Sequence, residues 1–189
     1  MPASRVNQTI VIILMGFLSF LVRSKAQPPE TKKNPADAGR ALREMMLTTA
    51  PKKTGEKPSK EFPRLYGVLM DWPISEQIAT VFATSAGAAS LYTTSTFGII
   101  GGEGHETVRV AARNFVRAAD QYFDSSTPTV DYSYPTGDRV RFYFLTFGGV
   151  RVIETDFRSI ADGTNKHREF FGLGQDVLTQ LRLVSEKHE

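Results

Sequence analysis

The sequence contains no cysteine, only three histidines and a single tryptophan. The absence of cysteine excludes disulfide bonds, zinc sites with thiolate ligands and lipid attachment through cysteine. It leaves the compartment open, because cysteine-free chains occur in exported and in cytoplasmic proteins alike. The histidines, at positions 105, 167 and 188, form no spaced cluster with carboxylates. We therefore predict no metal site and no cofactor.

Most of the chain also lacks an excess of positive charge. Residues 1–63 carry eleven Lys and Arg against five Asp and Glu, whereas residues 64–189 carry twelve against fifteen. A nucleic-acid-binding domain needs clustered basic residues to neutralise phosphate groups. We therefore expect no nucleic-acid partner for the slightly acidic residues 64–189, which we predict to form a single globular domain.

The N-terminal part contains an apolar run at residues 9–22. Its fourteen residues are fewer than the roughly 20 that a transmembrane helix needs, but they match the core of a signal peptide, about 7 to 15 residues. Ser24-Lys25-Ala26 offers a small-x-small cleavage site after Ala26. Residues 1–26 are therefore predicted to be a signal peptide or a short membrane anchor.

The charges around this run leave two destinations open. Four basic residues follow the run and one precedes it, namely Arg23, Lys25, Lys32 and Lys33 against Arg5. The positive-inside rule would then keep the body in the cytoplasm. We expect an exported (periplasmic or extracellular) or membrane-tethered body, and a cytoplasmic one if the anchor holds it inside or the start is wrongly assigned.

Residues 27–63 have the composition of a linker, with many lysines and with Pro28, Pro29, Pro35, Pro51 and Pro58. Within this segment, residues 37–49 place apolar side chains at helical spacing, and Asp37 is a candidate N-cap. We expect this short helix to pack onto the domain, with a partner-binding helix as the alternative. The basic linker and residues 9–22 are the candidate contacts with a membrane.

The first half of residues 64–189 has the pattern of a three-stranded meander. Residues 65–70, 78–84 and 89–96 are rich in β-branched and aromatic residues, and residues 85–88 suit a tight turn between the last two segments. We expect another turn at residues 71–73, because a residue that precedes proline favours extended geometry.

The second half changes from helical to strand periodicity. Residues 105–123 have apolar side chains at the i, i+3, i+4 and i+7 spacing of an amphipathic helix, and residues 175–184 repeat that spacing. Residues 129–134 are expected to form an edge strand, and residues 139–147 and 150–155 a hairpin around Gly148-Gly149. Large apolar side chains alternate to both sides of residues 139–147, so we expect both faces of the sheet to be covered.

These elements together predict an α+β fold, with a mostly antiparallel sheet of five or six strands, a long central helix and terminal helices. The order of elements over residues 37–184 resembles the roadblock/longin group of profilin-like domains. The resemblance is one of topology, and no functional residue carries over. It implies a dimerising scaffold rather than an enzyme.

A glycine-rich segment, Phe97-Gly98-Ile99-Ile100-Gly101-Gly102-Glu103-Gly104-His105-Glu106-Thr107, precedes the central helix. It lacks the Lys-Ser/Thr ending of a P-loop and the spacing of a dinucleotide-binding loop. Glu103 and Glu106 complement the helix dipole and would repel an anion. If Gly101, Gly102, Gly104 and His105 bind a ligand, we expect it to be neutral or cationic.

Catalysis would need His105 as a base, with Glu106 and with Ser85 as nucleophile. Ser85 lies in Ala83-Thr84-Ser85-Ala86-Gly87, which lacks the first glycine of a nucleophile elbow. We therefore favour a non-catalytic protein, and keep a small-ligand binder or hydrolase-type enzyme around His105 as the alternative.

The remaining candidates concern protein association. Arg109, Arg113 and Arg117 form a basic stripe on the central helix, for an acidic partner or for ion pairs with Glu106 and Asp120. Trp72 is either a core residue or an exposed anchor. The hypothesis is a protein-interaction domain that contacts a partner or a second copy through a sheet edge or the central helix.

Overall fold

The computed structural model describes residues 35–95 and 98–186, all of which belong to the compact unit Lys33–Glu189. The apolar run at residues 9–22 and the predicted cleavage site lie outside the described residues. Among the residues that are described, no helix is long and apolar enough to cross a membrane.

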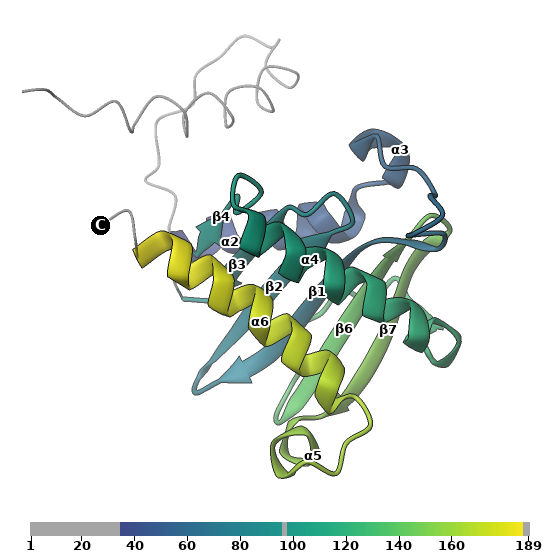
Figure 1. Ribbon diagram of the computed structural model, residues 1–189. Coiled ribbons are helices and arrows are strands. Elements are labelled where there is room, and N and C mark those ends of the chain that lie inside the picture. The colour runs from purple at the N-terminus through teal and green to yellow at the C-terminus, as the bar shows by residue number, and fades with distance from the viewer. Residues whose placement is uncertain (1–34, 96–97, 187–189) are drawn as a thin grey trace, which may run out of the picture. The chain divides into compact units, whose positions relative to one another are not determined.

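The described chain forms a seven-stranded antiparallel open sheet in the order β4-β3-β2-β1-β6-β7-β5 (Figure 1). The strands are β1 (Leu65–Ile74), β2 (Gln77–Thr84), β3 (Ala89–Thr93), β4 (Ile99–Ile100), β5 (Thr127–Pro128), β6 (Arg139–Thr146) and β7 (Gly149–Asp156). The predicted α+β class with an antiparallel sheet is confirmed. The sheet exceeds the expected five or six strands because two-residue strands, β4 and β5, close its two edges.

Helices cover both faces of this sheet. Their bounds are α2 (Pro35–Thr48), α3 (Pro51–Thr54), α4 (Glu106–Ala119), α5 (Phe157–Asp162) and α6 (Arg168–Ser185), with a 3-10 helix η1 (Asp120–Ser125) after α4. Helices α4 and α6 lie side by side on one face, and α2 lies on the opposite face (Figure 1). Residue Asp37, the candidate N-cap, lies in the first turn of α2.

The alternation in β6 divides the core into two layers. Phe142 and Phe144 are buried beneath α4 and α6, whereas Tyr143 and Leu145 are buried on the other face with Leu47 of α2. Successive side chains of a strand point to opposite faces, so one strand can supply both layers. The expectation that both faces are covered is confirmed.

The last helix is longer than its sequence suggested. It begins at Arg168 rather than near residue 175, so Phe170, Phe171, Gly172 and Gly174 are helical. Glycine usually weakens a helix. A Cβ on Gly174, however, would lie 2.5 Å from Met70 Cε and 3.2 Å from Phe115 Cζ. Gly174 therefore allows the helix to approach the sheet closely.

Other expected boundaries were also wrong. The turn between β6 and β7 is Phe147-Gly148 rather than Gly148-Gly149, because Thr146 pairs with Gly149. There is no turn at residues 71–73, because β1 continues through Trp72 and Pro73, which pair with Ala79 and Ile78 of β2. Residues 129–134 form no strand either, since β5 ends at Pro128. The backbone of this segment is instead bound by side chains: Tyr132 O accepts from Arg43 Nη1 at 2.8 Å, and Ser133 O accepts from the Tyr143 hydroxyl at 2.7 Å.

Candidate interaction surface

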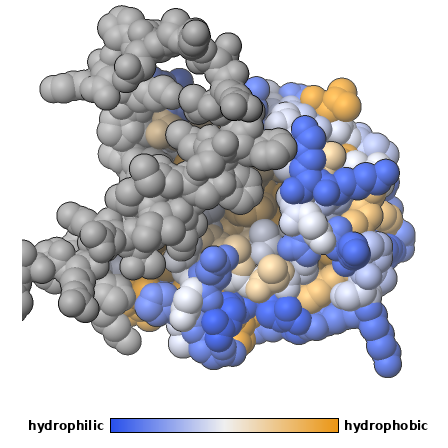
Figure 2. Space-filling model, turned by 90° about the horizontal axis from the view of Figure 1, so that it is seen from above, coloured by the Kyte–Doolittle hydropathy of each residue, from blue (hydrophilic) through white to orange (hydrophobic). Residues whose placement is uncertain are grey.

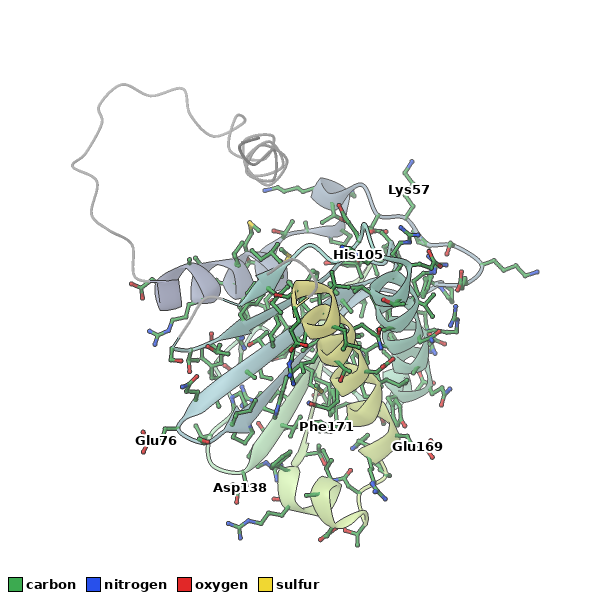
Figure 3. All side chains as sticks on the ribbon, turned by 60° about the vertical axis from the view of Figure 1, so that its left-hand side comes forward. Lys57, Glu76, His105, Asp138, Glu169 and Phe171 are labelled. Atoms are coloured by element: carbon green, nitrogen blue, oxygen red, sulfur yellow. The ribbon has the colours of Figure 1, made fainter. Side chains whose placement is uncertain are left out.

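Helices α4 and α6 form an antiparallel pair on one face of the sheet. The Phe115 and Phe170 rings, near the end of α4 and the start of α6, lie 4.9 Å apart. At the other end of the pair, Thr107 of α4 and Gln180 of α6 line the same groove. Figure 3 accordingly shows His105 and Glu169, which mark the starts of the two helices, at opposite ends of this layer.

The groove between the two helices has a volume of about 290 Å³. It is lined by Glu106, Thr107, Val110, Ala111, Asp176 and Gln180. Val110 is 47% exposed, and Leu183, one helical turn beyond Gln180, is also 47% exposed. Residues three or four apart share a helix face. The outer surface of the helix pair, which we call the α4–α6 face, thus carries two exposed apolar side chains next to a groove.

The ionised side chains that line this groove are both carboxylates. Glu106 forms an ion pair with Arg109 of the same helix, and Asp176 Oδ1 accepts a hydrogen bond of 3.3 Å from Gln180 Nε2. Both contacts are exposed, so neither holds its carboxylate rigidly. The groove therefore presents an apolar floor with acidic groups at its rim.

The arginine stripe of α4 faces a different segment. Arg113 and Arg117 both form ion pairs with Glu61, and hydrogen bonding from Arg117 lowers the pKa of Glu61. Of the ion pairs expected within the helix, only that of Arg109 with Glu106 is present; Asp120 pairs with Arg64 instead. Two of the three arginines thus bind the segment before β1 rather than line the groove.

The glycine-rich segment has a structural explanation. A Cβ on Gly102 would lie 2.4 Å from Val108 Cγ1 and 2.9 Å from Leu181 Cδ2, so any side chain there would have to displace these two residues of α4 and α6. Gly101 has a φ of +77°, which other residues rarely adopt. Gly104 has open space around it, and His105 is the N-cap residue of α4 without a side-chain cap.

The proposed catalytic residues lie in different surroundings. Ser85 is buried, and its hydroxyl donates to Glu56 Oε2 at 3.2 Å. Glu106 lines the α4–α6 groove, whose lining includes neither His105 nor Ser85. Trp72, the candidate anchor, is 3% exposed within β1, where its ring meets Phe171 edge-on at 6.0 Å. It belongs to the core.

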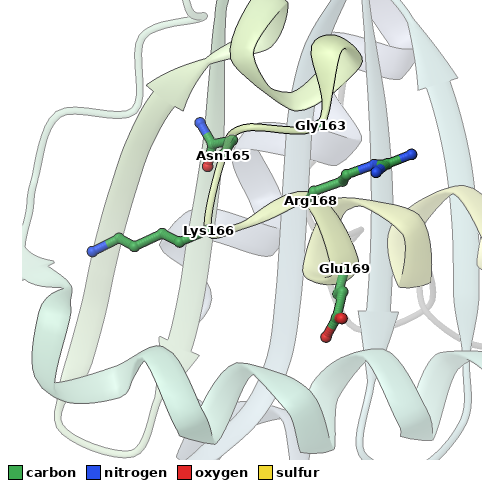
Figure 4. Close-up of a pocket in the computed structure, with 5 residues that line it drawn as sticks. All are labelled: Gly163, Asn165, Lys166, Arg168 and Glu169. Atoms are coloured by element: carbon green, nitrogen blue, oxygen red, sulfur yellow. The ribbon is translucent and has the colours of Figure 1, made fainter.

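A second cavity, of about 530 Å³, lies at the loop between α5 and α6. It is lined by Gly163, Asn165, Lys166, Arg168 and Glu169 (Figure 4). The Lys166 and Arg168 side chains point away from each other there, and the Asn165 amide donates to the Thr155 and Ser159 hydroxyls at 2.6 and 2.7 Å. The polar groups therefore do not converge on a point where a ligand would sit.

Sequence reasoning missed a buried ion pair between α2 and β1. Arg43 donates to Asp71 Oδ2 from Nε at 3.0 Å and from Nη2 at 2.5 Å, and Thr80 donates to Asp71 Oδ1 at 2.5 Å. Complete burial raises the pKa of Asp71, and Arg43 and Thr80 oppose this rise. Arg43 occupies the same helix stripe as Gly39 and Leu47, both buried, so its role becomes apparent only once α2 is placed against the sheet.

His167 is a second buried polar group without an expected role. It is 5% exposed, and neither ring nitrogen hydrogen-bonds to a described residue. Its ring lies 5.3 Å from that of Tyr122. Burial, together with Lys166, lowers the pKa of His167. The folded protein therefore holds this imidazole neutral in preference to charged.

Because the pKa of His167 is lower in the folded protein than in the unfolded chain, protonation of His167 should destabilise the folded protein. The contribution of His167 to stability is complete above its unfolded pKa, about 6.5, and decreases as the pH falls below that value. Replacing His167 by phenylalanine should make the free energy of unfolding fall less between pH 7 and about pH 5.5. Urea titrations at both pH values measure this, and an equal fall in both proteins would contradict the assignment.

Comparison with protein-family models, curated proteins and solved structures finds no match for this chain. Among the described residues, no group of three or more His, Cys, Asp and Glu side chains is placed to hold a metal ion. Evidence on function therefore comes from the α4–α6 face and from the charges around it.

Proposed function

We propose that this chain is a non-catalytic domain that works by associating with another protein through its α4–α6 face. The observation that carries the proposal is the pair of half-exposed apolar side chains, Val110 and Leu183, beside the groove. Such side chains contribute most to binding when a partner removes them from water. The resemblance to roadblock/longin domains supports the same role.

The groove also favours a particular chemistry in the partner. Its acidic rim, Glu106 and Asp176, attracts basic groups, and its apolar floor accepts aliphatic side chains. An amphipathic helix with apolar and basic residues combines both features. A second copy that met the same face would bring two acidic rims together, so it would have to dock at an offset.

The proposal includes export or membrane tethering through residues 1–26. The apolar run and the Ser24-Lys25-Ala26 motif support it. Mass spectrometry of the mature N-terminus from the native host would test this part separately. A start at Gln27 indicates a cleaved signal peptide, whereas an intact Met1 with the chain in the membrane fraction indicates an anchor.

The change Val110→Glu tests the contact surface. We expect it to weaken the association at least about tenfold, because a charge at a desolvated position of an interface has no partner. The measurement is quantitative mass spectrometry of proteins that cross-link to the full chain in its host, self-association included. Leu183→Glu should lower the recovered amount of the same partner.

Val130→Glu is the matched control, because Val130 is 91% exposed in the segment after β5. It makes the same chemical change away from the groove. The proposal requires a partner, or a second copy, that is retained with Val130→Glu and lost with Val110→Glu. Equal recovery with both variants would show that the α4–α6 face is not the contact.

A further inference from the structure

The segment between α2 and β1 exposes a cluster of lysines. Lys52, Lys53, Lys57 and Lys60 lie within nine residues, and all four are exposed. None forms an ion pair with another described residue. Helix α3 contains no buried residue, stands clear of the sheet in Figure 1, and ends at Gly55 in a left-handed conformation. This segment therefore exposes its charge without contributing to the core.

The two carboxylates in this segment are already engaged. Glu56 accepts a hydrogen bond from Ser85, and Glu61 is shared by Arg113 and Arg117. Arg113 also lies over the Phe62 ring, with its Cζ 4.9 Å from the ring centroid. One carboxylate between two guanidinium groups leaves a positive excess at that point.

The fold thus joins two basic features that are far apart in the sequence. Arg113 and Arg117 of α4 bind Glu61, which belongs to the same segment as the four lysines. We treat these groups together as one basic surface, made of Lys52, Lys53, Lys57, Lys60, Arg113 and Arg117. Figure 3 shows Lys57 pointing away from the body, and Figure 2, which views the α3 end, shows hydrophilic side chains that extend outward around the rim. Four of its six residues come from the basic residues 1–63, and residues 64–189 are slightly acidic, so the surface places positive charge beside an acidic body.

We propose that this basic surface docks the domain onto an anionic lipid surface. Flexible, separated lysines suit a fluid layer of headgroups better than one small anion, because they present no convergent geometry. The choice of a membrane as partner rests on the proposed tethering by residues 9–22. Twelve residues separate that run from α2, so a bilayer that holds residues 9–22 would lie within about 40 Å of the start of α2 along the extended chain.

The experiment compares binding of the full chain to two kinds of vesicle. Neutral phosphatidylcholine vesicles report the contribution of the apolar run, and vesicles with about 30% phosphatidylserine add that of the basic surface. We expect stronger binding to the anionic vesicles and loss of this difference at high salt. Each lysine near an anionic membrane strengthens binding to that membrane by about fivefold. Lys57→Glu with Lys60→Glu should therefore lower the anionic binding by about 25-fold or more and leave the neutral binding unchanged.

The control makes the same change in net charge elsewhere. Lys166→Glu with Arg168→Glu alters the loop between α5 and α6 and the first residue of α6, at the opposite end of the body from α3 (Figure 1). We expect it to change the anionic binding by about twofold or less.

Equal losses in the two double variants, or no preference of the wild type for anionic vesicles, would overturn the proposal. Binding to duplex DNA without binding to anionic vesicles would also overturn it. The Val110→Glu variant separates the two proposals. It should lose the protein partner of the α4–α6 face but still bind anionic vesicles through the basic surface.

Discussion

Replacing Arg43 by alanine is expected to lower the free energy of unfolding by about 3 to 5 kcal/mol. Arg43 and Asp71 are both buried, so the substitution leaves the Asp71 carboxylate in the protein interior with only the Thr80 hydroxyl as a donor among the contacts described. It also removes the donor to Tyr132 O and the guanidinium group that lies 4.1 Å from the Tyr134 ring centroid. Urea unfolding followed by circular dichroism measures the loss.

Three comparisons make this result specific. Arg40→Ala removes an exposed arginine of the same helix and should cost about 0.5 kcal/mol or less. Without Arg43, burial should raise the pKa of Asp71 further, so the destabilisation should be smaller at low pH, where the carboxyl group is protonated. Arg43→Met combined with Asp71→Asn should lower the free energy of unfolding less than Arg43→Met alone does. If the double variant were as unstable as the sum of the single ones, the ion pair would not be the cause.

Replacing Phe170 by alanine is expected to lower the free energy of unfolding by a similar amount, about 3 to 5 kcal/mol. Phe170 is 1% exposed, and its ring centroid lies within 6 Å of four others, those of Phe115, Tyr122, Phe142 and Phe144. Removing the ring would open a cavity between α6, α4 and the sheet, which the rigid strands cannot close. Thermal and urea unfolding measure the loss.

Phe171 is the matched control for this change. It is the next residue of α6 and only half-buried, with its ring against those of Trp72 and Phe157 at 6.0 and 5.7 Å. Phe171→Ala should therefore cost clearly less than Phe170→Ala. An equal or larger loss of stability with Phe171→Ala would mean that α6 does not turn the Phe170 side of the helix towards the sheet.

Patterns with a short period in the sequence predicted the fold well. The alternation at Phe142, Tyr143, Phe144 and Leu145 correctly assigned two covered faces to β6, because side-chain direction in a strand depends only on neighbouring residues. The helical spacing at residues 105–123 likewise located α4, although the last part of that range is a 3-10 helix. The boundaries at Trp72 and near Gly174 failed, because glycine and proline signals were outweighed by packing against distant residues.

The sequence by itself determined the antiparallel α+β class, the central helix and the separation of a basic N-terminal part from an acidic body. Only the tertiary structure decided that Arg43 neutralises Asp71, that Arg113 and Arg117 meet Glu61 beside the linker lysines, and that Val110 remains exposed beside a groove. The physical reason is the range of each interaction. Periodicity follows from the local geometry of helix and strand, whereas an ion pair or a groove depends on which distant segments the folded chain brings within a few ångströms.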